Sequence, residues 1–352
     1  MSPTSPGPAH GAESTDLEIP TKAATIYDVA KAAGVSHQTV SRYLSGYAGI
    51  RPQTRERVEQ ALAFLDYRPN RSARTLRTGR SQRLVALTHQ IDQFGPRKIV
   101  QGASVAARDL GYVLDILSLD LASTTAVESA LESVQASECD GVLVLTATDE
   151  MSHALRHAHF DVPAVTADEA DDGLAQKPTQ LSTAGFPALV SHLDALGHRR
   201  IAHISGPAGW SASRNRVRGL QAALRAADLP EALILEGDWS AASAHRLTTR
   251  LLDTEAVTAI VAANDQMALG AILAVTQRGL RVPHDISVTG VDDIPEAAYI
   301  CPPLTTLRID FGRQGHDAVR RLMAVMRGAK EPILTSQHSQ LIVRESTGAA
   351  RE

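Results

Sequence analysis

The sequence contains few of the residues that mark secreted, metal-binding or membrane proteins. Its 352 residues include only two cysteines, Cys139 and Cys301, which suggest no disulfide framework and stand in no metal-ligand spacing. The longest apolar runs, such as 141–145, have the length of a strand and are far too short to span a membrane. Residues 1–20 lack Lys, Arg and the apolar core of a signal peptide. We therefore expect a disordered leader over residues 1–22, a cytoplasmic protein and no membrane partner.

Motifs of the common enzyme classes are also missing. No GxGxxG follows a predicted strand, and GxxxxGK[ST], GxSxG, HExxH and CxxC do not occur. The thirteen histidines are scattered, and the nearest approach to a cluster, His153, His157 and His159, has no acidic partner placed by spacing. Surface histidines are the simpler interpretation. We predict a protein without catalytic residues, metal or cofactor.

The net charge of −4 conceals an uneven distribution. Residues 21–83 contain twelve Lys or Arg and four Asp or Glu, whereas residues 84–352 carry a net charge of −9. A small basic segment fused to an acidic body is typical of a nucleic-acid-binding domain joined to another domain. A solvated charged surface would give the same totals, so the local sequence has to decide between the two.

The basic segment has the pattern of three short helices. Residues 26–33 form an amphipathic stretch that Gly34 ends, and Ser36 is a good N-cap for a second helix that runs to about Leu44. A third helix is expected over 52–65, where a proline occupies the first turn and apolar residues share one face. Two short helices joined by a tight glycine-containing turn are typical of a helix-turn-helix.

Polar residues open the second predicted helix, where a helix-turn-helix meets base edges. Gln38 can pair bidentately with adenine and Arg42 with guanine, whereas the hydroxyls of Thr39 and Ser41 more often contact phosphates. An exposed polar face without a partner is the alternative.

The segment after the third helix argues independently for DNA. It is rich in arginine, compatible with a helix after Pro69, and contains one large apolar residue, Leu76. A single Leu on a cationic helix suits a wedge inserted into the minor groove. A linker whose Leu packs on the neighbouring domain is the alternative.

From residue 84 onward, apolar strand-like runs alternate with amphipathic helix-like segments. This alternation predicts parallel sheets covered by helices on both faces, and the length suits two such lobes. Ligands of such sheets bind beyond the carboxyl ends of the strands, here in the cleft between the lobes. The predicted strands are 84–87, 113–117, 142–145, 201–204, 233–235, 260–262 and 286–291.

Several motifs are specific enough to point to one family. The basic segment contains YDVA from Tyr27, AGVSxQTVSR from Ala33 and YxPNxxA from Tyr67, and the body contains EGDWSA from Glu236 and VAANDQMALGA from Val261. These motifs resemble the LacI/GalR family of transcriptional regulators over nearly the whole chain. The resemblance implies an all-α helix-turn-helix domain with a hinge helix, followed by a two-lobed α/β domain of the periplasmic-binding-protein type with doubly wound parallel sheets.

The domain boundaries that we expect follow from this resemblance. The helix-turn-helix domain would cover 23–68, the hinge helix 69–81, the effector-binding and dimerisation domain 82–347, and a tail 348–352. Within the large domain, the first lobe would contain 82–181 and 309–338, and the second 182–308 and 339–347.

The resemblance also assigns residues to DNA. In this family, the residues that match His37, Gln38 and Arg42 read the major groove, and the residue that matches Leu76 is the wedge of a hinge helix that forms on operator DNA. The best-known member has Tyr in place of His37, which leaves the base read there open. The full set of predicted DNA contacts is Thr25, Tyr27, Ser36, His37, Gln38, Thr39, Ser41, Arg42, Asn70, Ala73 and Leu76.

A second set is assigned to a sugar effector. Carboxylates, an amide and a guanidinium offer fixed donors and acceptors to hydroxyl groups, and a tryptophan ring can stack on a pyranose. A helix cap at Asp149 and a structural salt bridge between Arg216 and Asp292 are the alternatives. Ile309 replaces a polar Gln of the best-known member, which leaves open whether the sugar is a galactoside. The predicted effector contacts are Asp149, Arg216, Trp239, Asn264, Asp292 and Phe311.

These inferences predict a repressor whose affinity for a palindromic operator is controlled by a small sugar. The chain ends without the leucine-heptad tail of the best-known member, so a homodimer is expected. Three other functions remain open: a sugar-binding transport protein, an enzyme that uses Asp149 and Asp292 on a sugar, and a DNA-binding regulator without a ligand.

Overall fold

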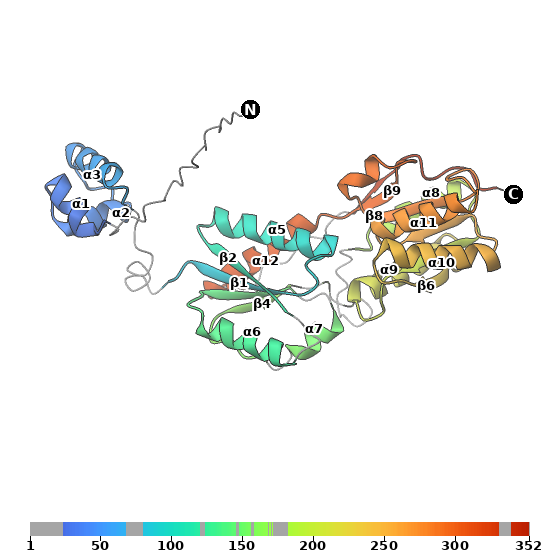
Figure 1. Cartoon of the computed structure of the whole chain (residues 1–352), viewed down its shortest axis with the longest axis horizontal. Helices are drawn as coiled ribbons and strands as arrows, with labels where there is room; N and C mark the ends of the chain where they lie inside the picture. The colour runs from blue at the N-terminus through green and yellow to red at the C-terminus, as the bar shows by residue number, and fades with distance from the viewer. Residues whose placement is uncertain are drawn as a thin grey trace, which may run out of the picture. The chain divides into compact units, whose positions relative to one another are not determined.

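The computed structural model (Figure 1) contains two compact units, one within residues 1–79 and one formed by residues 80–352. The predicted leader, and the predicted hinge helix up to residue 79 with Asn70, Ala73 and Leu76, lie outside the described residues. The structure describes residues 24–67, 80–119, 124–145, 148–155, 158–167, 169, 171, 182–330 and 339–351.

The small unit contains the three helices predicted from the sequence: α1 (Ile26–Ala33), α2 (His37–Leu44) and α3 (Pro52–Phe64). A capping box between Thr25 and Asp28 begins α1, and Gly34 ends it in the left-handed region, at φ 61°. The side chain of Ser36 caps α2. Val29, Val40 and Val58 are fully buried and connect the three helices in one small core.

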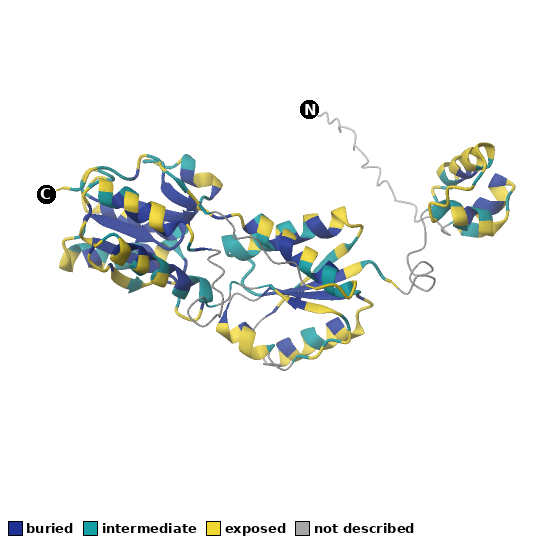
Figure 2. Ribbon diagram, turned by 180° about the vertical axis from the view of Figure 1, so that it is seen from behind, coloured by how far each residue is buried: buried dark blue, intermediate teal, exposed yellow. Residues whose placement is uncertain are grey.

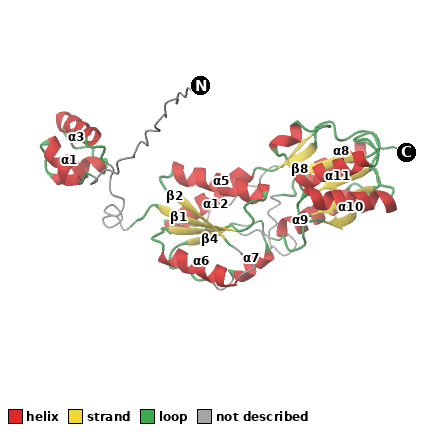
Figure 3. Ribbon diagram, in the orientation of Figure 1, coloured by secondary structure: helices red, strands yellow, loops and turns green. Residues whose placement is uncertain are grey.

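The large unit has two lobes, each with a central sheet. The first sheet is entirely parallel, with the strand order β2-β1-β3-β4. Helices α5 and α12 cover one face of it, and α6 and α7 cover the other (Figures 1 and 3). The elements of this lobe are β1 (Arg83–Thr88), α5 (Phe94–Asp109), β2 (Val113–Ser118), α6 (Thr124–Ala136), β3 (Gly141–Val144), α7 (Asp149–Ala154), β4 (Ala164–Thr166) and α12 (Phe311–Met326).

The second lobe has six strands in the order β10-β9-β8-β7-β5-β6, all parallel except β10, which runs antiparallel to β9. Helices α10 and α11 cover one face, and α8 and α9 cover the other. The elements are α8 (Phe186–Ala195), β5 (Ile201–Ser205), α9 (Ser211–Ala226), β6 (Leu233–Glu236), α10 (Ala241–Thr254), β7 (Ala259–Ala262), α11 (Asp265–Gln277), β8 (Ser287–Asp292), the 3-10 helix η1 (Pro295–Ala298), β9 (Thr305–Arg308) and β10 (Gln340–Ile342).

All seven strands predicted in the body are present, and three that were not predicted accompany them. Of these, β4 and β10 have only three residues each. In β9 two of the four residues are threonines that are nevertheless fully buried. Thr306 donates a hydrogen bond to Asp265 (2.5 Å), and the hydroxyl of Thr305 donates to the backbone carbonyl of Arg344 (3.2 Å). Tertiary partners thus permit polar residues in a central strand, which an apolar run cannot indicate.

The central strands of the two sheets are buried (Figure 2), whereas the edge strands β2 and β6 are partly exposed. The chain leaves the second lobe after β9 and returns to the first, where α12 packs against α5. None of the helices in the described part of the chain is long and apolar enough to cross a membrane.

Candidate functional site

Among the described residues, predicted DNA-contacting side chains lie together on the first two helices of the small unit. On α2, His37, Gln38 and Arg42 are exposed, and the spacing of four residues between Gln38 and Arg42 places both on one face. The exposed Tyr27 comes from α1, and its ring centroid lies 5.2 Å from that of His37. The surface therefore offers an amide, a guanidinium and two aromatic rings side by side.

Two other predicted DNA contacts have a structural role in the same region. Thr25 Oγ1 accepts a hydrogen bond from the backbone N–H of Asp28 and donates one to its carboxylate. Ser36 Oγ accepts from the backbone N–H of Thr39 (3.2 Å). These hydroxyls therefore begin the helices that present the exposed side chains.

Five of the six predicted effector contacts line a single cavity in the large unit. Thr88, Leu145, Asn264 and Asp292 stand at or just beyond the carboxyl ends of parallel strands, where ligands of such sheets bind. The lining comes from both lobes. It consists of Thr88, Gln93, Phe94, Gly95, Pro96, Ile99, Leu145, Ala167, Glu169, Trp210, Ser211, Ala212, Arg216, Trp239, Asn264, Asp292, Phe311, Gln314, Ala318 and Arg321.

Aromatic rings are concentrated in this cavity. The chain has only two tryptophans and five phenylalanines, and both tryptophans and two of the phenylalanines line it. Trp210 and Trp239 meet edge to face with their ring centroids 5.5 Å apart, and Phe94 and Phe311 do so at 6.1 Å. The cavity therefore has rigid apolar walls for the C–H faces of a ligand.

A buried ion pair forms part of the cavity lining. Arg216 Nη2 is 3.5 Å from Asp292 Oδ1, and both side chains are 5% exposed. Arg216 also donates to the backbone carbonyl of Ala263, and its guanidinium carbon is 5.5 Å from the ring centroid of Trp239. These contacts fix the guanidinium in one orientation.

The backbone at the cavity is held in an unfavourable conformation. Trp239 has φ 69° and Asp292 has φ 117°, although neither is glycine. Asn264 stabilises the backbone conformation of Trp239, because its Nδ2 donates to the carbonyl of Trp239 (3.0 Å). The Oδ1 of Asn264 accepts from the backbone N–H of Met267 and so caps α11. Asn264 thus positions Trp239 as well as lining the cavity.

Several buried polar atoms of the cavity lining have no hydrogen-bond partner. They are Arg216 Nε, Trp239 Nε1, Gln314 Nε2 and Thr88 Oγ1, and three of the four are N–H donors. Leaving such groups unpaired in a buried site costs about 1–3 kcal/mol each. The lining is therefore suited to a ligand rich in hydrogen-bond acceptors.

Burial raises the pKa of Asp292 to about 7, with Glu169 adding to the rise and Arg216 opposing it. Because the pKa in the folded state lies above the ordinary value of 3.8, folding favours the protonated carboxyl. The contribution of Asp292 to stability is thus greatest at acid pH and is lost as the pH rises through about 7. We expect the free energy of unfolding of the wild type, relative to Asp292→Asn, to fall between about pH 4 and about pH 7. Denaturant unfolding at a series of pH values measures this difference, and a constant value would contradict the assignment.

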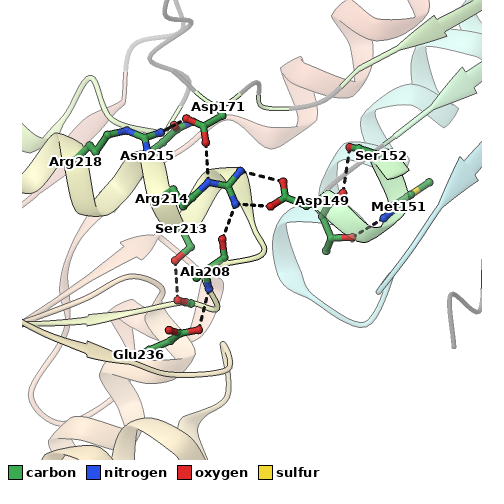
Figure 4. Close-up of polar contacts among 12 residues, drawn as sticks. Asp149, Met151, Ser152, Asp171, Ala208, Ser213, Arg214, Asn215, Arg218 and Glu236 are labelled. Atoms are coloured by element: carbon green, nitrogen blue, oxygen red, sulfur yellow. Dashed lines mark hydrogen bonds and ion pairs between the residues drawn. The ribbon is translucent and has the colours of Figure 1, made fainter. Parts of the chain in front are cut away.

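Asp149, the sixth predicted effector contact, does not line the cavity. Its carboxylate forms a bidentate pair with Arg214 of α9 (2.7 and 3.0 Å), as Figure 4 shows. Arg214 Nε also binds Asp171 (2.7 Å). The backbone N–H of Asp149 donates to the carbonyl of Gly209 (2.9 Å), so this cluster joins α7 of the first lobe to the second. Asp149 begins α7 directly after the N-cap Thr148, and no fixed motif around it in the sequence indicated its pairing with Arg214, 65 residues away.

Several side chains of the cavity were not predicted from the sequence, namely Thr88, Phe94, Glu169, Trp210, Gln314 and Arg321. The scarcity of tryptophan could have indicated Trp210, but no local pattern marks Glu169. Among the described residues no group of three or more His, Cys, Asp or Glu could hold a metal ion.

Comparisons with known proteins agree with this geometry. Residues 25–70 match the family described as bacterial regulatory proteins, lacI family, and residues 190–347 match a periplasmic binding protein-like domain. The lactose operon repressor of Escherichia coli (strain K12) is 36% identical over 309 residues, which cover 87% of this chain and 86% of that protein.

Two solved structures are similar over almost the whole chain. One is a lac repressor dimer bound to operator and the anti-inducer ONPF, with a TM-score of 0.77, 33% identity and coverage of 93% of this chain and 100% of the other. The second is a complex of the transcriptional regulator CelR with cellobiose, with a TM-score of 0.66, 30% identity and coverage of 92% and 99%.

Proposed function

The chain belongs to the LacI family of bacterial DNA-binding transcriptional regulators, and we propose that it is a repressor released from its operator by a small sugar. Members of this family are cytoplasmic regulators with an effector-binding domain and are not enzymes. The helix-turn-helix and the two-lobed fold expected from the sequence are both confirmed. The proposal concerns the effector, the operator and the direction of control.

The observation that carries the proposal is a cavity that combines aromatic walls with unpartnered donors. Ring faces favour the C–H faces of a pyranose, while Arg216 Nε, Trp239 Nε1 and Gln314 Nε2 can donate to its oxygens. A solved relative binds cellobiose, which supports a sugar in this chain. A galactoside is the first candidate, because the lactose operon repressor is among the relatives.

One difference bears on the identity of the sugar. Ile309 is 5% exposed, packs in the same apolar cluster as Phe311 and is not part of the cavity lining. The amide of Gln314, on the first turn of α12, does line it. Gln314 therefore offers a polar contact from a different position than the Gln that replaces Ile309 in the lac repressor. We expect the sugar of this chain to differ from that of the lac repressor in the arrangement of its hydroxyl groups.

The proposed mechanism is repression by occupancy. Two copies of the helix-turn-helix would bind the half-sites of a palindromic operator as a homodimer, and the related lac repressor dimer on operator DNA supports this arrangement. A sugar that prefers the lobe arrangement of the released state would weaken operator binding. Because this coupling is reciprocal, operator DNA should weaken sugar binding by the same factor.

Operator selection from random duplexes, followed by binding at fixed salt with a panel of galactosides and other sugars, tests the proposal. We expect the protein to select one palindromic sequence, and one class of sugar to release the protein from it. If the protein binds one palindrome tightly and no sugar changes that binding, the chain is a regulator without a sugar effector. A sugar that tightens operator binding would reverse the proposed direction of control.

A further inference from the structure

An exposed tyrosine lies against the arginine that is predicted to read a base. The guanidinium carbon of Arg42 is 5.7 Å from the ring centroid of Tyr47, and Tyr47 is 55% exposed. Tyr47 lies three residues beyond the end of α2, and its backbone N–H donates to the carbonyl of Arg42 (3.0 Å). The ring and the arginine are therefore connected through the last turn of the helix as well as through their side chains.

The position of this ring depends on a glycine. A β-carbon on Gly49 would lie 2.5 Å from Cε1 of Tyr47 and 2.8 Å from its Oη. Real β-carbons essentially never approach so closely, so the ring can occupy this place only because residue 49 has no side chain. Gly49 and Arg42 thus contact the Tyr47 ring, and the contact with Gly49 restricts where the ring can lie.

We propose that Tyr47 is a positioning residue for Arg42, and that the preference of Arg42 for its base depends on the tyrosine ring. This inference rests on the proposed function, in which Arg42 reads a base. A bidentate contact to guanine needs the planar guanidinium in one orientation, whereas a free arginine loses much rotamer entropy on binding. Stacking on Tyr47 removes part of that freedom before DNA is bound, so less is lost on the operator.

A second arginine–tyrosine pair in the same domain shows the difference between packing and positioning. Arg55 of α3 lies 5.7 Å from the ring centroid of Tyr43, and the hydroxyl of Tyr43 donates to Glu59 (2.9 Å). That pair joins α2 to α3 and is part of the structure of the domain. Tyr47, by contrast, is 55% exposed and lies beyond the end of α2, beside Arg42.

The test is a comparison of variants of the full chain on the selected operator and on duplexes changed at single base pairs. Arg42→Ala first identifies the base pair that Arg42 reads. At that pair we expect Tyr47→Ala to reduce discrimination about two- to fivefold, the strength of an exposed cation–π contact, with an unchanged salt dependence. Tyr47→Phe should retain wild-type discrimination because it keeps the ring. Gly49→Ala should reproduce the loss because its methyl group displaces the ring.

The decisive comparison is the double variant. If Tyr47 acts through Arg42, Tyr47→Ala should cause no further loss when Arg42 is already alanine. Equal losses with and without Arg42, or a loss in Tyr47→Phe, would mean that Tyr47 contacts DNA itself and would overturn the proposal.

Phe64→Ala is the matched control, because it removes an 85% exposed ring from α3 of the same domain. It should leave discrimination unchanged. If Arg42→Ala altered no base preference, the proposed reading of the operator would fail together with this inference. If Arg42→Ala altered a base preference and Tyr47→Ala did not, only this inference would fail.

Discussion

Replacing Arg216 with methionine should abolish the response to the sugar effector and lower the free energy of unfolding by about 3 kcal/mol. The substitution leaves Asp292 buried, 5% exposed, without the guanidinium that now lies 3.5 Å away. It also removes the cation from the Trp239 ring and one unpartnered donor from the cavity. Because burial already raises the pKa of Asp292 to about 7, the carboxyl can take up a proton, which keeps the cost at the lower end of the range for a broken buried pair.

Arg225→Met is the control for this experiment. Arg225 lies on the same helix and pairs with Glu231, but both side chains are at least 60% exposed, so its loss should change stability little. Denaturant unfolding measures the first effect, and operator binding with the sugar found in the screen measures the second. A variant Arg216→Met that still released its operator at the wild-type sugar concentration would show that the effector binds elsewhere.

The parts of the fold that the sequence predicted are those with local signals. The end of α1 and the start of α2 were found because Gly34 and Ser36 act on backbone groups within a few residues. The central parallel strands β1, β3, β5, β7 and β8 were found because they are buried and read as apolar runs. In β9, by contrast, the burial of two threonine hydroxyls depends on hydrogen bonds to residues about forty positions away, and no local pattern indicates such partners.

The same distinction applies to the candidate site. Arg216, Trp239, Asn264 and Asp292 stand in recognisable motifs near strand or helix ends, and the fold brings them to one cavity. The partners of Asp149 could not be found in this way, because Arg214 reaches it from 65 residues away. Motifs therefore indicated which residues gather at the cavity, whereas side-chain pairing depended on the arrangement of the two lobes.

Replacing Gly315 with valine should have a similarly large effect, through the two helices that hold the phenylalanine pair. A β-carbon on Gly315 would collide with the backbone carbonyl of Ile99, and one on Gly102 would collide with that of Gly312. Helices α5 and α12 therefore touch backbone to backbone, with no flexible side chain between them that could yield. Overpacking at such a contact should lower the free energy of unfolding by about 3 kcal/mol.

The first residues of these two helices form part of the cavity. Phe94 begins α5 and Phe311 begins α12, and their edge-to-face contact forms one wall of the cavity. Separating the helices should move the rings apart, so Gly315→Val should weaken sugar binding even where the protein remains folded. Sugar titration and denaturant unfolding of the same variant measure the two effects.

Gly312→Ala on the same helix separates this packing effect from the general effect of replacing a helical glycine. A β-carbon there would meet only Asp310 Oδ1, at 3.5 Å, which is an ordinary contact. Alanine is also the better helix former, so stability should stay within about 1 kcal/mol of the wild type or rise. If both variants lost stability equally, the close approach of α5 and α12 would not be what Gly315 provides. If only Gly315→Val lost both stability and sugar affinity, the helix contact would be the support of the aromatic wall.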